Sequence, residues 1–308
     1  MITTLRRFWK RLTHDALGPE RARINEKIRW VAQSAKDTEE FKKRSELVAA
    51  ELGPQSIPIL PKLLHSEVSP PPELKAEWEL PFGAWMSARQ SAIFEVLYHL
   101  REASLPAVRK VAFGKYDWTT AKAICVLCRF AMEGIQTQSI TAELVVALPD
   151  MEYETVLGSI HSMARLAAHR SDMADALLKL ADDWDKDSHI EALEILQPLA
   201  LHAPDVARKR LDPFLAVMRT GGRGTRDPIL DGHAVERRTP EGKTYIAAIS
   251  GNEYPAIADY HAIRAALLLH KLLPDSDEVM ANLHDWQQNH PDEEVRKEIS
   301  EHLAENGG

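Results

Sequence analysis

Four of the acidic residues between positions 183 and 194 have the spacing of a calcium-binding loop. Carboxylates at the first, third, fifth and twelfth places of such a loop supply the oxygen ligands that Ca²⁺ prefers. Ser188 stands where this loop requires glycine, and Ser188 with Glu191 instead favours a capping box for a following helix. We therefore predict a helix connection without a metal, and calcium binding is the alternative. The four candidate ligands are Asp183, Asp185, Asp187 and Glu194.

The two cysteines, Cys125 and Cys128, have the Cys-x-x-Cys spacing of zinc and redox motifs. Tetrahedral zinc needs four ligands, and the sequence has no second pair. The surrounding residues are apolar with helical spacing, so we predict that both cysteines are buried in a helical core. No His-Glu-x-x-His or Gly-x-Ser-x-Gly motif occurs in the sequence. The sequence thus predicts no catalytic residue, no cofactor and no enzymatic activity.

Residues 205–243 are basic within an acidic protein. They hold nine basic and six acidic side chains, a balance of +3, whereas the whole chain has a formal charge of −8. Glycine-rich backbone can approach an anion closely and arginine can pair with it in a fork, so this stretch is a candidate contact for an anion or a protein partner. The alternative is a surface insertion that covers apolar helix faces. The candidate residues are Arg219, Arg223, Arg226, Arg237 and Arg238.

The glycine- and proline-rich stretch at residues 220–250 cannot continue a helix. HAVERR and KTYIAAI flank the turn Thr239-Pro240-Glu241-Gly242, and their β-branched and aromatic residues favour strands. We therefore predict a Gly-rich loop followed by a β-hairpin. A second insertion, SEVSPPPELKAEWELPFG at residues 66–83, is predicted to be a loop because of its proline cluster.

The remaining sequence is organised as pairs of amphipathic helices. A Ser or Asp marks the start of the second helix of each pair, at intervals of 48, 35, 32, 34 and 71 residues. The first interval contains the insertion at 66–83, and the last, about twice the others, contains the predicted hairpin. The period is therefore near 34 residues, and units must stack because one pair cannot bury its apolar face alone. The anchors are Ser56, Ser104, Ser139, Ser171, Asp205 and Ser276.

Two segments connect this pattern with a known architecture. LPAVRKVA at residues 105–112 and HPDEEVRKEISEHLA at residues 290–304 resemble bacterial HEAT-like repeats. The second has the run Asp292, Val295 and Arg296 of such repeats. The resemblance covers about residues 40–218 and 258–305, and it implies an all-α, right-handed α-solenoid of helix pairs. It implies no single activity, because such solenoids serve as scaffolds, adaptors, inhibitors and occasionally enzymes.

We predict four parts along the chain. A terminal repeat needs an atypical polar outer face, so both ends are assigned to caps. The parts are N-terminal capping helices at 1–36, HEAT-like repeats with the loop at 66–83 over 37–218, the loop and β-hairpin at 219–257, and a C-terminal repeat with an acidic cap at 258–308.

Charge and hydropathy narrow the choice of partner. An acidic chain repels nucleic acids and anionic membranes, and no apolar run reaches the roughly 20 residues of a membrane span. The N-terminus lacks the apolar region of a signal peptide, so we expect a cytoplasmic protein that binds another protein. The favoured function is a non-enzymatic scaffold of adaptor, inhibitor or immunity type. The alternative is a nucleic-acid-binding protein resembling DNA-repair glycosylases, with the stretch 205–243 and Trp78, Trp85 and Trp118 as contacts.

Overall fold

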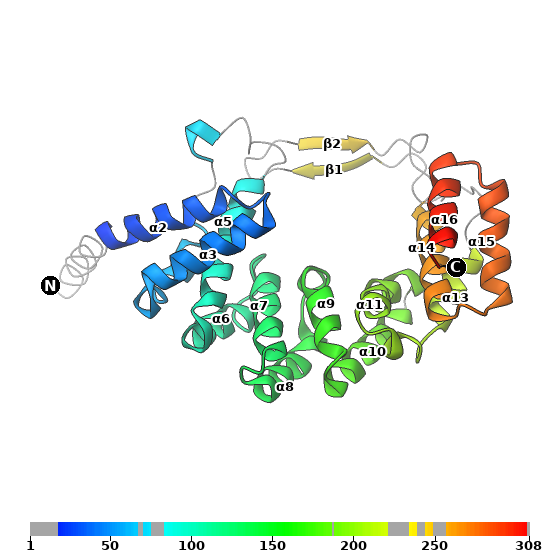
Figure 1. Cartoon of the computed structure of the whole chain (residues 1–308), viewed down its shortest axis with the longest axis horizontal. Helices are drawn as coiled ribbons and strands as arrows, with labels where there is room; N and C mark the ends of the chain where they lie inside the picture. Colours follow the sequence, from blue (N-terminus) through cyan, green and yellow to red (C-terminus); the bar gives the residue numbers. More distant parts are fainter. Residues whose placement is uncertain are drawn as a thin grey trace. The chain divides into compact units, whose positions relative to one another are not determined.

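The chain forms mostly α-helices joined by short turns (Figure 1). Its computed structural model describes residues 18–66, 70–74, 83–186, 188–220, 234–238, 244–248 and 257–306. They belong to two compact units, Met1–Leu166 (unit 1) and Ala167–Gly308 (unit 2). Among the helices of these described ranges, none is both long and apolar enough to cross a lipid bilayer.

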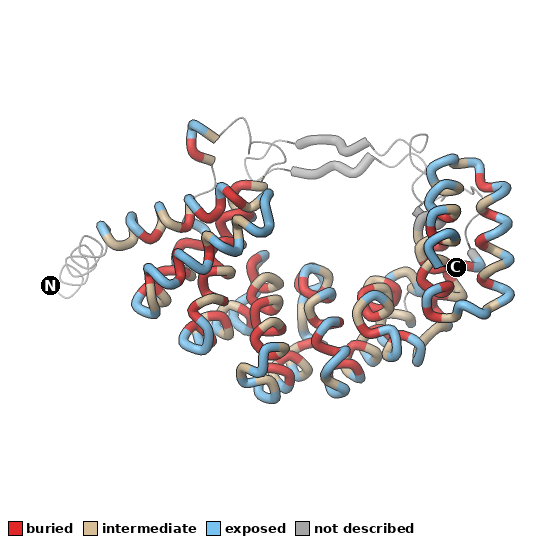
Figure 2. Tube along the Cα trace, in the orientation of Figure 1, coloured by how far each residue is buried: buried red, intermediate tan, exposed pale blue. Residues whose placement is uncertain are grey.

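Helix α5 (Ala84–His99) is the centre of unit 1. Both preceding long helices and α7 pack against it, and most of its residues are buried, from Trp85 to Tyr98 (Figure 2). A helix that buries most of its surface is stable only when it is packed among other helices, and its one open stripe carries the polar residues Ser87, Ser91 and Glu95. The remaining elements are α2 (Gly18–Ala32), α3 (Thr38–Leu52), η1 (Pro54–Ser56), η2 (Leu60–Leu63), η3 (Pro72–Leu74), η4 (Arg101–Ser104), α6 (Leu105–Ala112), α7 (Thr120–Met132), α8 (Thr137–Ala147), η5 (Leu148–Asp150) and α9 (Tyr153–Ala167).

Most residues of the apolar faces predicted from helical spacing are buried, although Ile190, Leu267 and Leu273 are only half-buried. In α7, Ile124, Leu127 and Phe130 are fully buried. Equivalent residues of α9 are buried as well, including Val156 and Met163. Period 3.6 in the sequence was therefore sufficient to locate these helices and the face that each one buries.

Two turns in unit 1 have the same unusual backbone. Arg101 follows α5 with a φ of +57°, and Gln136 precedes α8 with a φ of +45°. These left-handed conformations are uncommon for residues other than glycine. Both lie in the turn between the two helices of a pair, where the chain reverses direction, and one period separates them.

The predicted helix beginning at Gln55 is wrong. The structure has the short 3₁₀-helices η1 and η2 there. Pro58 and Pro61 lack the N–H groups that an α-helix would need at these positions, and their rings would clash with the preceding turn. Only parts of the proline-rich segment at 66–83 are described, and they include η3.

The polar anchors have different roles at different helices. Ser276 caps α15, because its Oγ accepts a hydrogen bond from the backbone N–H of Val279 at 3.5 Å. Ser104 stands at the start of α6, but its Oγ donates to the carbonyls of Leu97 and Arg101. Ser139 lies inside α8 and is not a cap. The anchors therefore do not share one capping role.

Unit 2 is a succession of packed helices with one pair of strands. Helix α11 packs against α10, α12, α13 and α14, while α14 packs against α13 and α15, and α15 packs against α16. The helices are α10 (Ser171–Asp185), α11 (His189–His202), α12 (Pro204–Ala207), α13 (Asp212–Thr220), α14 (Ile257–Leu272), α15 (Asp277–Asn289) and α16 (Glu293–Asn306).

The two strands of unit 2 are β1 (Ala234–Arg238) and β2 (Thr244–Ala248). They pair antiparallel, with Ala234 opposite Ala248 and Arg238 opposite Thr244. The Gly-rich loop predicted before them and the turn between them lie outside the described residues.

Gly158 offers a test of the contact between α7 and α9. A Cβ at this position would lie 2.7 Å from the Cβ of Ala121, closer than two carbon atoms can pack. We expect Gly158→Ala to lower the free energy of unfolding by about 1–2 kcal/mol in urea denaturation, although alanine is the better helix former. Adding Ala121→Gly should recover part of the loss. An unchanged stability of Gly158→Ala would contradict this close contact.

Candidate functional site

The loop between α6 and α7 presents three aromatic side chains to solvent. Phe113, Tyr116 and Trp118 are 36%, 46% and 63% exposed. We call residues 113–118, with sequence FGKYDW, the aromatic loop. Large aromatic side chains are usually at least half-buried in a folded chain, and Trp118 is the one of the three that is more than half exposed.

A chain of hydrogen bonds holds the aromatic loop in place. Asp117 Oδ1 accepts from the backbone N–H and the hydroxyl of Thr119, at 2.6 and 2.7 Å. Its other oxygen, Oδ2, lies 3.2 Å from His65 Nε2. His65 Nδ1 in turn accepts from Trp118 Nε1 at 3.4 Å, and the two rings stack with centroids 6.4 Å apart. Trp118 is thus exposed but anchored, because the start of α7 and the segment after η2 both hold it.

These bonds assign the protonation of the groups involved. Trp118 Nε1 is only a donor, so His65 Nδ1 must be unprotonated and Nε2 carries the proton that it donates to Asp117. Partial burial opposes ionisation of Asp117. The bonds from Thr119 and the neighbouring His65 outweigh it and lower the pKa of this carboxyl. The loop therefore contains a carboxylate that is already satisfied internally.

A polar seam runs along the contact between α5 and α7. It consists of Ser87, Ser91 and Glu95 on α5, which face Lys122 and Arg129 on α7. Arg129 binds both carboxylate oxygens of Glu95, at 2.5 and 2.9 Å. Its guanidinium also lies 3.5 Å from the centre of the Tyr98 ring. The seam thus combines a bidentate ion pair with a cation–π contact, and both orient α7 on α5.

Glu95 is ionised far below its ordinary range. Burial opposes its charge, but the hydrogen bonds from Arg129 and His99, together with their charges, lower the pKa to about 2. Its side chain is only 12% exposed. Because the ion pair is largely shielded from water, removing one partner would leave a poorly solvated charge.

No family model, curated protein or solved structure matches this chain.

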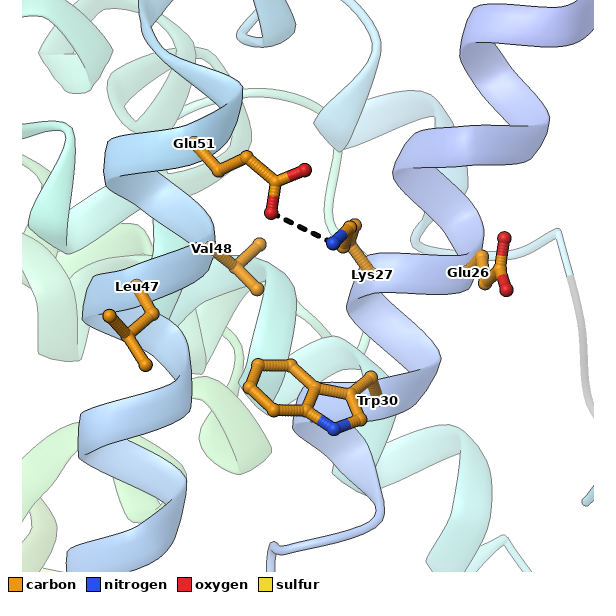
Figure 3. A pocket seen from close by; sticks show the side chains of 6 residues that line it. All are labelled: Glu26, Lys27, Trp30, Leu47, Val48 and Glu51. Carbon is orange, nitrogen blue, oxygen red and sulfur yellow. Dashed lines mark ion pairs between the residues drawn. The ribbon is translucent and has the colours of Figure 1, made fainter.

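Two shallow hollows in unit 1 are further candidates for binding. One of about 620 Å³ lies between α2 and α3, lined by Trp30 and Leu47 with Lys27 paired to Glu51 at 2.8 Å (Figure 3). The face of Trp30 is already occupied, because the guanidinium of Arg44 lies 4.7 Å from its ring centre. The other, of about 590 Å³, lies between the ends of α3 and α5 beside His99 and Arg101. Neither hollow has convergent polar groups of the kind that orient a small ligand.

The structure describes three of the five arginines that were predicted to contact a partner, and two of these only by their backbone. Arg219 is exposed at the end of α13 and forms a bidentate ion pair with Glu278 of α15, at 2.7 and 2.9 Å. Arg237 and Arg238 lie in β1, and only their backbone is described. Arg223 and Arg226 lie outside the described residues. Arg219 therefore has a carboxylate partner within unit 2, whereas the other four stay predictions.

The predicted calcium ligands do not share one loop. Asp183 and Asp185 lie in the last turn of α10, and Glu194 lies in the middle of α11, while Asp187 is not described. Asp183 pairs with Lys186 at 2.7 Å, and Asp185 binds His189 and Arg210. Within the described ranges, no group of three or more His, Cys, Asp or Glu side chains is arranged to hold a metal ion.

The two cysteines differ in burial. Cys128 is fully buried as predicted, and burial raises the pKa of its thiol. Cys125 is only half-buried, and its Sγ lies 3.6 Å from the carbonyl of Gly158.

Trp85 is 1% exposed, so its predicted contact with a nucleic acid is wrong because a buried indole cannot stack on a base. Trp78 lies outside the described residues.

Sequence reasoning missed most of the aromatic loop and all of the seam. Trp118 was considered only as a nucleic-acid contact, and His65 was not considered at all. The density of aromatic residues in FGKYDW, in a chain with 6% aromatic residues, was the available signal. The partners across the seam are 31–35 residues apart, and only the predicted repeat period could have indicated them.

The Glu95–Arg129 pair predicts a pH-dependent stability. Glu95→Gln should lower the free energy of unfolding at pH 7 by about 2 kcal/mol. This is less than the roughly 3 kcal/mol equivalent to the pKa shift, because Glu95 is partly solvated. The folded-state pKa is depressed, so the stabilisation is present above the unfolded value near 4.5 and is lost as the pH falls toward 2. Urea denaturation of both proteins between pH 3 and 7 measures this difference.

Glu143→Gln is the matched control for this prediction. Glu143 pairs with Arg109 at 2.8 Å across the same interval of 34 residues, but its side chain is 36% exposed. A more exposed pair should contribute about 1 kcal/mol or less. Equal losses for the two variants, or a Glu95→Gln loss that does not change with pH, would contradict the role assigned to burial.

Proposed function

We propose that this protein is a HEAT-like α-solenoid without enzymatic activity, which binds another protein through the aromatic loop. The solenoid is right-handed in this proposal, as in the HEAT-like repeats that the sequence resembles, and the strands β1 and β2 belong to an insertion that replaces one helix pair. The binding role is that of a scaffold, an adaptor, an inhibitor or an immunity protein. The exposed and anchored Trp118 is the observation that carries the proposal.

Side-chain contacts at intervals of one period support the repeat. Arg129 binds Glu95, Arg109 binds Glu143 and Gln136 binds Glu102, each across 34 residues. Cys125 contacts Gly158 across 33 residues. In unit 2, His270 and His302 are in contact across 32. When identical positions of successive units face each other, contacts recur at the period of the sequence, as in stacked helical repeats.

Three properties of the aromatic loop support a protein partner. Tryptophan and tyrosine are enriched at the energetic centres of protein interfaces. The hydrogen bonds from Asp117 through His65 to Trp118 fix the loop before binding, which reduces the entropy that a complex must lose. Lys110 and Lys115 are exposed beside the aromatic residues, and they favour a partner surface with apolar and acidic side chains.

We expect Trp118→Ala to weaken the complex by about 2 kcal/mol or more, roughly 30-fold in Kd, because an anchored tryptophan is a typical energetic centre of an interface. A photoreactive amino acid at Tyr116 would first crosslink the partner in cell extract and allow its identification. Calorimetry with the purified partner then measures Kd. Val146→Ala is the control, since Val146 is 78% exposed on α8. Equal affinity of Trp118→Ala and the unmodified protein would contradict the proposal.

The basic segment is tested separately. Charge reversal of both Arg223 and Arg226 should weaken the same complex if the insertion belongs to the interface, because like charges would then face the arginine-binding surface of the partner. The measurement is again Kd, compared at 50 and 300 mM salt. An unchanged Kd at both concentrations would remove the insertion from the interface and leave the aromatic loop as the contact.

A further inference from the structure

Lys122 differs from the other cations of the α5–α7 contact. Arg129 has Glu95 as its counter-ion, and Arg101 has Glu133. The ammonium of Lys122 instead bonds the hydroxyls of Ser91 and Ser87, at 2.9 and 3.3 Å. Among the described residues, no carboxylate forms an ion pair with it. The seam therefore contains a half-buried positive charge for which the described residues provide no carboxylate partner.

Desolvation makes this arrangement costly. Burial lowers the pKa of Lys122, and only the neighbouring thiol of Cys125 acts in the opposite direction. Two neutral hydroxyls compensate the lost hydration of an ammonium group only partly. An unpaired cation in this position is therefore stabilised by any anion that can reach it.

The two serines keep hydrogen-bonding capacity. Helical serines elsewhere in this chain, such as Ser45 and Ser159, donate their hydroxyl protons to the carbonyl one turn earlier, at 2.8 and 2.7 Å. No carbonyl in the described ranges takes the hydroxyl protons of Ser87 or Ser91. A serine hydroxyl both accepts and donates, so each can receive a bond from Lys122 and give one to a ligand.

Three donors thus converge at one place, and no acceptor among the described residues takes their protons. They are the remaining N–H of Lys122 and the hydroxyls of Ser87 and Ser91. Ser87 is exposed and the other two residues are half-buried, so a ligand can reach the group from solvent. Lys122 lies in the first turn of α7, four residues after Trp118, where the positive end of the helix dipole also favours an anion.

We propose that Lys122, Ser87 and Ser91 form a carboxylate-binding subsite, which takes an acidic side chain of the protein that binds the aromatic loop. One cation and two hydroxyl donors match a monoanion, whereas a phosphate dianion would keep an unbalanced charge. The assignment of the carboxylate to a protein partner rests on the proposed function. The subsite itself does not, because it follows from the donors and the charge.

The subsite is tested with acetate as the probe. The full chain would carry lysine labelled with ¹³C at Cε, and sodium acetate would replace sodium chloride at constant ionic strength and pH 7. We expect a saturable shift of the Lys122 signal, with a midpoint at least about fivefold lower than that of any change at exposed Lys110. Replacing both Ser87 and Ser91 by alanine should raise this midpoint about tenfold, as expected for losing hydrogen bonds to a charged group.

Some results would contradict the subsite itself, and another would contradict its preference for a carboxylate. A Lys122 signal that responds no more than Lys110, or that is unaffected by the loss of both serines, would overturn the subsite. Inorganic phosphate binding more tightly than acetate at the same pH would overturn the carboxylate assignment. Lys122→Met cannot be used in this experiment, because it removes the signal that is followed. The test therefore relies on the serine variants and on the comparison with Lys110.

The two proposals fail in different ways. Saturable acetate binding at Lys122, together with an unchanged partner affinity for Trp118→Ala, would leave the subsite intact and refute the proposed function at this loop. No acetate binding, together with a large loss of affinity for Trp118→Ala, would do the reverse. If both hold, Lys122→Met should weaken the partner complex about tenfold, while Lys110→Met should change it less than twofold.

Discussion

Burial of α5 is the constraint on which the first unit depends. Most residues of this helix are buried, so it needs α2, α3 and α7 packed against it before those residues leave water. The same is true of α7, because its residues Ile124 and Phe130 are buried only when neighbouring helices cover them. Each helix pair is thus unstable alone, and the order of the whole unit follows from the need to stack.

The packing of α5 against α7 also places polar groups opposite one another. Glu95 on α5 faces Arg129 on α7, 34 residues later, and Ser91 faces Lys122, 31 residues later. These separations are close to the period that the sequence predicts. Glu95 and Arg129 form an ion pair, whereas no carboxylate among the described residues pairs with Lys122. The polar seam therefore differs along its length, and the part without an ion pair lies beside the exposed aromatic residues.

Local patterns in the sequence predicted the helices well, because the 3.6-residue period of apolar residues depends only on near neighbours. They failed at Gln55, where proline outweighed an apolar pattern, and at Trp85, where burial was decided by tertiary packing. The candidate site was harder to foresee. His65 reaches Asp117 across 52 residues, and no local rule reports such a partner. The basic stretch has an unusual content of glycine and arginine that the sequence shows directly. The aromatic loop has several aromatic residues, but only the structure shows that Trp118 is exposed and held by His65.

The bond between His65 and Trp118 has a consequence for how the aromatic loop becomes ordered. The imidazole of His65 contacts both Asp117 and Trp118, which lie 52 and 53 residues later in the sequence. The most exposed aromatic ring is therefore oriented by a segment that is distant along the chain. Its position depends on the packing of unit 1 as a whole and not on the sequence of the loop alone.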